Sequence, residues 1–110
     1  VGGIKISETA SDLAVLIAIV SSMTNQAVSS KTAIFGEVGL GGEIRPVSRG
    51  QERIKEASKL GFTRIIVPLK NKAADIPDVE IIGVDNLRDA VKVVFGSNRV
   101  NHDDQVYPDE

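Results

Sequence analysis

Two short apolar segments in the second half of the chain limit the folds that it can adopt. They are Arg64–Pro68 (RIIVP) and Glu80–Val84 (EIIGV), and both are rich in β-branched residues. A strand that is apolar on both faces has to be buried on both faces, which occurs mainly in parallel sheets covered by helices. Helical patterns flank both segments. The sequence therefore predicts an α/β fold with a largely parallel sheet.

The first predicted helix is unusually apolar. Leu13–Val20 (LAVLIAIV) has no polar face, which a helix tolerates when it is buried on all sides or lies in a membrane. The run is too short for a bilayer, which takes about 20 residues. Thr9 and Asp12 have the spacing of a capping box and place the helix start near Ala10. We therefore expect a helix buried at the centre of the core, and no membrane contact.

Two more helices are expected. Gln51–Leu60 follows Ser48, which is suited to capping a helix start, and precedes Gly61, which is suited to a left-handed C-terminal position. Asn86 is placed to cap a last helix, Leu87–Phe95. The residues expected to face the core are Ile54, Ala57 and Leu60 in the former helix, and Leu87, Ala90, Val91 and Val94 in the latter.

A glycine-rich hairpin lies between the first two helices. Ala33–Val38 (AIFGEV) is predicted as a strand, Gly39–Gly42 as a tight turn and Glu43–Val47 as the returning strand, where Pro46 ends the pairing. The glycines do not form a dinucleotide-binding fingerprint, because Ile44 takes the place of the third glycine. They are better explained by the turn, where positive φ angles are needed.

Composition and charge exclude several kinds of site. Aromatic residues make up 4% of the chain, which argues against a surface that stacks bases or sugars. The absence of cysteine excludes disulfides and thiol chemistry and fits the reducing cytoplasm, and the first residues do not resemble a signal peptide. Residues 31–72 hold nine Lys or Arg against four Glu (net +5), whereas residues 73–110 hold three against nine acidic residues (net −6). A basic middle segment can mark a surface for polyanions, and the alternative is an ordinary solvated surface of an exposed helix and its loops.

The two ends of the chain are predicted to differ from the rest. Val1–Ile6 (VGGIKI) has the pattern of a strand end, as if the domain began inside a larger protein with an upstream strand partner. Ser97–Glu110 is acidic and without periodicity, so we expect a disordered tail after a domain of residues 1–96. His102 is the only histidine; it lies in this tail, is expected to be exposed, and has too few neighbouring ligands for a metal site.

One long stretch of the chain resembles a known family. It reads GEVGLGGEIRPVSRGQERIKEASKLGFTRIIVP and, with the apolar helix before it, resembles the proteolytic domain of the Lon protease family. Within that group it is most similar to the C-terminal Lon-like domain of the RadA (Sms) family of bacterial DNA repair proteins. The resemblance covers about residues 1–96. It implies a layered α/β (α+β) fold of the ribosomal protein S5 domain 2-like type, truncated at its N-terminal end.

The resemblance also implies a lost active site. Lon-type proteolysis uses a serine at the start of the first long helix and a lysine in the helix after the hairpin, and alignment on the Gly36-Glu37 pair places these at Ala10 and Arg53. Ala10 has no nucleophile, and a guanidinium does not deprotonate in proteins. This domain is therefore expected not to be an enzyme, with ATPase activity in the parent protein. An alternative is an active Ser/Lys peptidase of unusual geometry that uses Ser11, beside Thr9, with a neighbouring lysine.

The family's role suggests partners for the chain. In the RadA family the domain follows a zinc motif and a RecA-like ATPase, in a hexameric ATP-driven motor for branch migration during recombination and repair. The resemblance implies DNA and further copies of the chain as partners. It implies no cofactor in this chain, and ATP, Mg²⁺ and Zn²⁺ in upstream domains. A second alternative is a purely structural oligomerisation module.

The basic residues of the middle segment are the candidates for DNA contact. A guanidinium at position 53 suits a phosphate or carboxylate better than a deprotonatable lysine does. Arg53 also has a structural interpretation, an internal ion pair with Glu37 or Glu43, because buried arginine is normally paired. The candidate DNA-binding residues are Arg45, Arg49, Arg53, Lys55 and Lys59, with Lys31 as a further candidate.

Overall fold

The sheet at the centre of the fold is parallel, as the apolar segments predict. β4 (Arg64–Pro68) lies between β1 (Thr32–Ile34) and β5 (Glu80–Val84) and pairs with both in parallel. The computed structural model describes residues 8–73 and 75–96. The strand expected over residues 1–6 and the tail expected over residues 97–110, with His102, lie outside the described residues.

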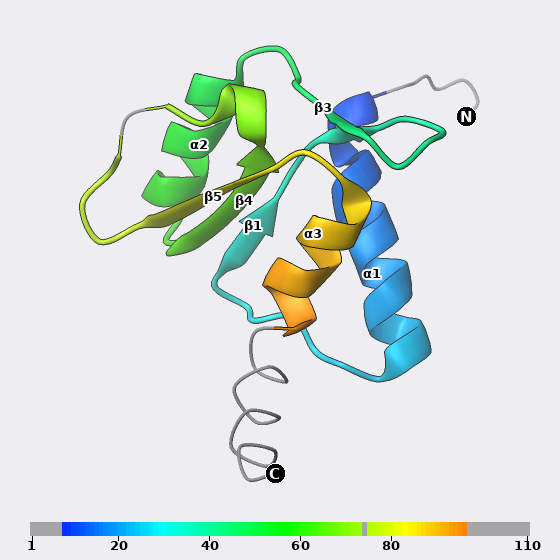
Figure 1. The fold of residues 1–110 in the computed structure, drawn as a ribbon. Coiled ribbons are helices and arrows are strands. Elements are labelled where there is room, and N and C mark those ends of the chain that lie inside the picture. The colour runs from blue at the N-terminus through cyan, green and yellow to red at the C-terminus, as the bar shows by residue number, and fades with distance from the viewer. Residues whose placement is uncertain (1–7, 74, 97–110) are drawn as a thin grey trace, which may run out of the picture.

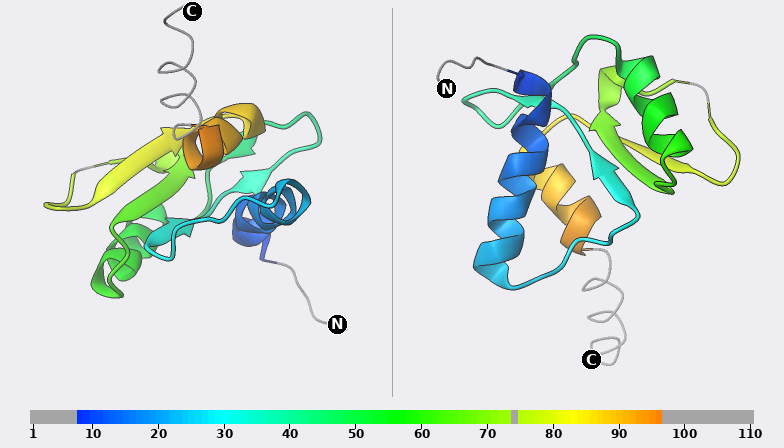
Figure 2. Two further views of the ribbon diagram at one scale, coloured as in Figure 1. Left: turned by 90° about the horizontal axis from the view of Figure 1, so that it is seen from below. Right: turned by 180° about the vertical axis from the view of Figure 1, so that it is seen from behind.

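Helices cover both faces of this sheet, so the fold has three layers. α1 (Asp12–Thr24) and α3 (Leu87–Val91) lie side by side on one face, and α2 (Gly50–Lys59) lies on the other, as Figure 1 shows. Figure 2 shows the same layers from below and from behind. Ile66 of β4 packs with α1 and α3, whereas the flanking Ile65 and Val67 pack with α2. This alternation explains why β4 is apolar and buried from Ile65 to Pro68.

The hairpin is present, but it forms a small sheet of its own. β2 (Glu37–Val38) pairs antiparallel with β3 (Ile44–Arg45), and both strands are shorter than the sequence predicts. The single strand expected over Ala33–Val38 is wrong, because the chain leaves the parallel sheet after β1. It turns at Gly36, whose φ of 153° is open to glycine and rarely to other residues. An added Cβ there would lie 3.2 Å from Ile44 Cγ2, so the turn is also closely packed.

The prediction that the first helix is buried on all sides is wrong. Leu13 and Ile17 are buried against the sheet, but Val15, Ile19 and Met23 are 54%, 47% and 79% exposed. These three residues share the outer side of α1, which no described element covers. Within residues 8–73 and 75–96, no helix is long and apolar enough to cross a membrane.

Two predicted helix caps are also wrong. Ser48 does not cap α2; the N-cap is Arg49 in a left-handed conformation (φ 60°), without a side-chain hydrogen bond. Thr9 and Asp12 do not form a capping box, because a 3₁₀ turn, η1 (Thr9–Ser11), precedes α1. The carboxylate of Asp12 instead accepts a hydrogen bond from the Val38 N–H at 3.1 Å, which fastens the hairpin to α1.

The other two helix ends agree with the sequence. Gly61 has φ 99°, its N–H donates to the Ser58 carbonyl and the Phe62 N–H donates to the Ala57 carbonyl, which is the Schellman arrangement. The Asn86 side chain accepts from the Asp89 N–H at 2.9 Å and caps α3.

The inward faces of the last two helices are largely as predicted. α3 continues into a π turn, η3 (Lys92–Gly96), and its four predicted core residues pack as expected. In α2, Ile54 is buried and Ala57 packs beside it, but Leu60 is 69% exposed, so that part of the prediction is wrong.

A side-chain amide joins the loop before α2 to the turn that follows β4. After β4 the chain forms a short 3₁₀ turn, η2 (Leu69–Asn71). The Val47 N–H donates to Asn71 Oδ1 at 2.8 Å, and Asn71 Nδ2 donates to the Val47 carbonyl at 3.1 Å. Gly50 permits this approach, because an added Cβ would lie 2.5 Å from Asn71 Nδ2. The amide thus completes the backbone hydrogen bonding of a loop that has no strand partner.

We expect Asn71→Ala to lower the free energy of unfolding by about 1–3 kcal/mol, because it leaves two partly buried backbone groups of Val47 unpaired. Urea unfolding followed by circular dichroism measures the change. Lys72→Ala, at the exposed neighbour, is the control and should shift stability by no more than about 0.5 kcal/mol. Equal effects of the two substitutions would contradict the role given to Asn71.

Candidate functional site

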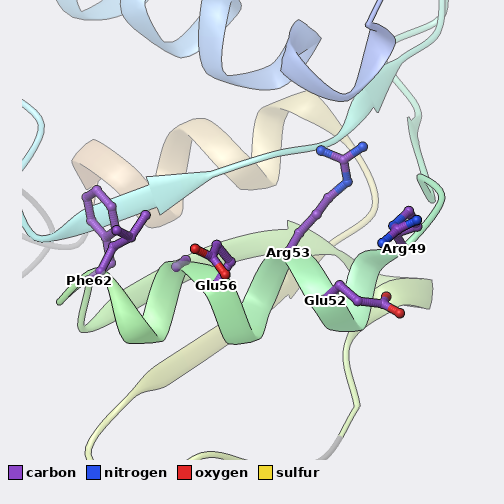
Figure 3. Close-up of a pocket in the computed structure, with 7 residues that line it drawn as sticks. Arg49, Glu52, Arg53, Glu56 and Phe62 are labelled. Carbon is purple, nitrogen blue, oxygen red and sulfur yellow. The ribbon is translucent and has the colours of Figure 1, made fainter.

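Arg53 joins the second turn of α2 to the segment that leads into α1. Its Nη2 lies 2.8 Å from Glu8 Oε2, and its Nε donates to the Ser48 carbonyl at 3.0 Å. The guanidinium carbon lies 6.0 Å from the centre of the Phe35 ring, a cation–π distance. Figure 3 shows the side chain rising from α2 towards β1 and the start of α1.

Ala10 and Arg53, the two positions that the resemblance aligns with the Lon catalytic residues, lie in the same region. Ala10 is buried in η1, two residues after the Glu8 that Arg53 binds. Its carbonyl accepts a hydrogen bond from the Gly36 N–H at 2.8 Å, which fixes this turn against the end of β1. At this place the chain offers a methyl group and a permanently charged guanidinium, a pair that has neither a nucleophile nor a base.

The predicted ion pair of Arg53 with Glu37 or Glu43 is wrong. Both carboxylates lie near Arg45 on the hairpin: Arg45 Nη2 is 2.6 Å from Glu43 Oε2, and Arg45 Nη1 is 3.9 Å from Glu37 Oε2. Arg45 therefore takes the partners expected for Arg53. The partner that Arg53 does have, Glu8, gives no sequence signal, because the two residues are 45 positions apart.

The two hydroxyls beside Ala10 have local partners or none. Ser11 Oγ donates to the Glu8 carbonyl at 3.0 Å, and Thr9 is exposed. In the part of the chain that the structure describes, neither hydroxyl bonds to a lysine. Lys55, the lysine nearest to Arg53 in the sequence, is exposed on α2. This arrangement gives no support to a peptidase that uses Ser11 and a lysine.

A broad groove runs along α2 beside Arg53. Its volume is about 510 Å³, and Figure 3 shows its lining side chains along the helix. Two arginines and two glutamates alternate along the part nearest the start of α2, so their formal charges cancel, and the other end is apolar. The lining residues are Arg49, Glu52, Arg53, Glu56, Ala57, Leu60 and Phe62.

A second cluster of charges holds the hairpin turn. Glu43 accepts from Arg45 Nε at 3.2 Å and from the Gly41 N–H at 3.1 Å, in addition to its ion pair with Arg45. Gly39 leaves room for this carboxylate, since an added Cβ would lie 2.0 Å from Glu43 Oε2. Hydrogen bonds from its own backbone and from Arg45 hold the pKa of Glu43 below its usual value.

The candidate DNA-binding residues do not form one patch. Arg45 lies on the hairpin within its ion pairs, and Arg49 and Arg53 line the groove. Lys55 and Lys59 are one helical turn apart on the exposed side of α2, and no ion pair engages them in the described structure. Lys31 precedes β1, where its carbonyl accepts from the N–H groups of Thr63 and Arg64.

The sequence analysis missed two exposed lysines near α2. Lys70 and Lys72 flank Asn71, and the Asn71 carbonyl accepts from Gln51 Nε2 in the first turn of α2 at 3.0 Å. Gln51 is one turn before Lys55 on the helix. The net positive charge of the middle segment was the sequence feature that could have pointed to these lysines. Net charge does not predict which helix a loop residue will approach. Among residues 8–73 and 75–96, no group of three or more potential metal ligands converges.

Comparison with known proteins places the chain in a family. A protein-family model described as subunit ChlI of Mg-chelatase matches residues 2–71, more than half of the chain. The chain belongs to this family. The match runs from the segment before α1, through the hairpin and α2, to the end of η2.

Several curated relatives carry the name DNA repair protein RadA. One from Pseudomonas aeruginosa is 50% identical over 96 residues, 86% of this chain and 21% of the relative. One from Haemophilus influenzae is 52% identical over 95 residues, 86% of this chain and 21% of the relative. One from Escherichia coli is 52% identical over 94 residues, 84% of this chain and 20% of the relative. The resemblance to RadA proteins is thus confirmed, and the chain spans about a fifth of the length of these relatives. Assignment to a Lon-like domain remains a prediction.

We expect the Glu43 carboxyl to titrate with a midpoint below 4.5, the ordinary value for glutamate. Because its pKa is lowered in the folded hairpin, the carboxylate stabilises the turn above pH 4.5, and this contribution is lost as the pH falls through the lowered pKa. The chemical shift of the carboxyl carbon, followed by NMR, measures the midpoint. Arg45→Ala should raise it only part of the way, since the backbone hydrogen bonds remain, and Arg49→Ala should leave it unchanged. A midpoint at or above the ordinary value would contradict this account.

Proposed function

We propose that the chain is a Lon-like, non-proteolytic domain of a RadA-type DNA repair protein, which helps to assemble that protein and contacts the DNA backbone. The longer protein would be a hexameric, ATP-driven motor of recombination in the cytoplasm, with ATP, Mg²⁺ and Zn²⁺ bound outside this chain. The observation that carries the proposal is the identity of about half of the residues, over most of the chain, with proteins named DNA repair protein RadA.

The surroundings of Arg53 support a role without proteolysis. A lysine base needs a dry site in which it can lose its proton, whereas this guanidinium is ion-paired, partly exposed and permanently charged. The guanidinium donates hydrogen bonds to Glu8 and to the Ser48 carbonyl at the same time. Arg53 thus links α2 to the segment that leads into α1.

Contact with DNA would rest on the cations that the fold leaves without an acidic partner. Arg49, Lys55 and Lys59 meet this condition in the described structure, and Lys70 and Lys72 lie nearby. Arg45 and Arg53 are weaker candidates, because their partners already neutralise them. The low aromatic content favours contacts with phosphates over stacking on bases.

We expect DNA binding that weakens with salt and depends on α2. The double variant Lys55→Ala/Lys59→Ala should bind fluorescent duplex DNA less tightly, and the slope of log K against log salt should fall in magnitude by about 1–2, because each phosphate contact contributes about 0.9. Fluorescence anisotropy at several salt concentrations measures both quantities. The matched control, Arg88→Ala/Lys92→Ala, removes the same charge from the opposite layer and should change the slope little.

Two outcomes would contradict the proposed DNA contact. Equal effects of the two double variants would show that only net charge matters. No salt-dependent binding by an assembled oligomer would favour the structural oligomerisation module.

We also expect that a serine-directed fluorophosphonate probe does not label the chain and that casein is not degraded, because no lysine among the described residues hydrogen-bonds to Ser11. A known serine protease in the same assay is the positive control. Labelling that disappears in Ser11→Ala would instead establish the unusual Ser/Lys peptidase.

A further inference from the structure

The outer side of α1 is an apolar surface without a cover in the described structure. Val15, Ile19 and Met23 follow each other at intervals of four residues, so they form one stripe on the helix. Asp12 is the only charged residue of α1, and it lies at the first position, bonded to the hairpin. The stripe is therefore uncharged along its whole length.

The apolar surface continues from α1 onto the hairpin. A shallow depression of about 380 Å³ is lined by Asp12, Val15, Leu16 and Val38, which links the stripe to β2. Two residues beyond Val38, Leu40 is fully exposed at the turn. From Met23 to Val15 the stripe is about 12 Å long, at 1.5 Å per residue, and the hairpin extends it.

We propose that this surface packs against an amphipathic helix with an uncharged apolar stripe, supplied by the same polypeptide in a longer protein. A helix matches the stripe, because apolar side chains repeated every three or four residues on one helix pack between the equivalent side chains of another. The partner has to be uncharged where it meets the stripe, because a charge placed against Val15, Ile19 and Met23 would be buried without a counter-charge.

The size of the surface argues against a second copy as the cover. Stable interfaces between separate proteins take about 20–30 residues a side. The stripe and its extension offer only a few large side chains. A helix on the same polypeptide needs less area, because a tether gives it an effective concentration that can reach millimolar values. Relatives about five times as long as the match have room for such a helix. The inference depends neither on DNA contact nor on the absence of proteolysis.

Met23 provides a direct test, because it is the only methionine of the chain. The experiment compares two proteins. One is the 110-residue chain alone, and the other is a chimaera, the Escherichia coli protein in which this chain replaces the 94 matching residues. Both are treated with hydrogen peroxide, and mass spectrometry of the tryptic peptide of residues 6–31 measures oxidation at Met23. We expect oxidation at least about tenfold slower in the chimaera, because a covered thioether reacts only when its surroundings open. A urea-unfolded sample of each protein gives the unprotected rate.

The remaining outcomes decide against the proposal. Equal rates in the folded chimaera and the chain would show that the surface stays open to water. Protection in the chain alone that grows with its concentration would assign the surface to a second copy. If the chimaera does not fold, the other four-fifths of the Escherichia coli protein are added to the chain as a separate fragment. Failure of that fragment to protect Met23 at any concentration would also overturn the proposal.

Discussion

Burial of β4 on both of its faces is the constraint on which the rest of the fold depends. Since neither face of the strand can meet water, a helix layer has to form on each side. α2 comes from the connection between β1 and β4, whereas α1 comes before β1 and α3 comes after β5. The two layers then differ in what they present to the solvent. α2 presents mainly charged side chains, whereas α1 presents an apolar stripe beside the charged side chains of α3.

The features that the sequence predicted correctly have local causes. The β-branched run of β4, Gly61 and Asn86 each determine structure through their immediate neighbours, and the parallel sheet and both helix ends follow from them. The features that it did not predict depend on distant segments. Asp12 bonds to Val38 in place of a cap, and Arg53 binds Glu8 in place of a hairpin carboxylate. The apolar run of α1 also does not predict which faces of the helix other parts of the same chain will cover.

Several charged side chains of the candidate site form intramolecular ion pairs and do not make up a binding surface. Arg45 closes the hairpin turn onto Glu43, and Arg53 spans from α2 to Glu8. Exposed ion pairs of this kind contribute little stability, but each is oriented by a hydrogen bond to the backbone. Arg53 donates to the Ser48 carbonyl, and Glu43 accepts from the Gly41 N–H. Arg53 therefore links α2 to the segment that precedes α1 in the opposite layer. The cations left over on α2 remain available for an external anion.

In the described structure, the hairpin is hydrogen-bonded to the starts of α1 and α3 and to the residue that follows β5. The Val38 N–H bonds to Asp12, the Ile44 N–H bonds to the Asp85 carbonyl at 2.9 Å, and the Leu87 N–H bonds to the Gly42 carbonyl at 2.8 Å. These bonds reach the first turns of both helices, whereas the turn at Gly36 separates the hairpin from the parallel sheet. The hairpin consequently bridges the starts of α1 and α3, two helix ends that are 75 positions apart in the sequence (from Asp12 to Leu87).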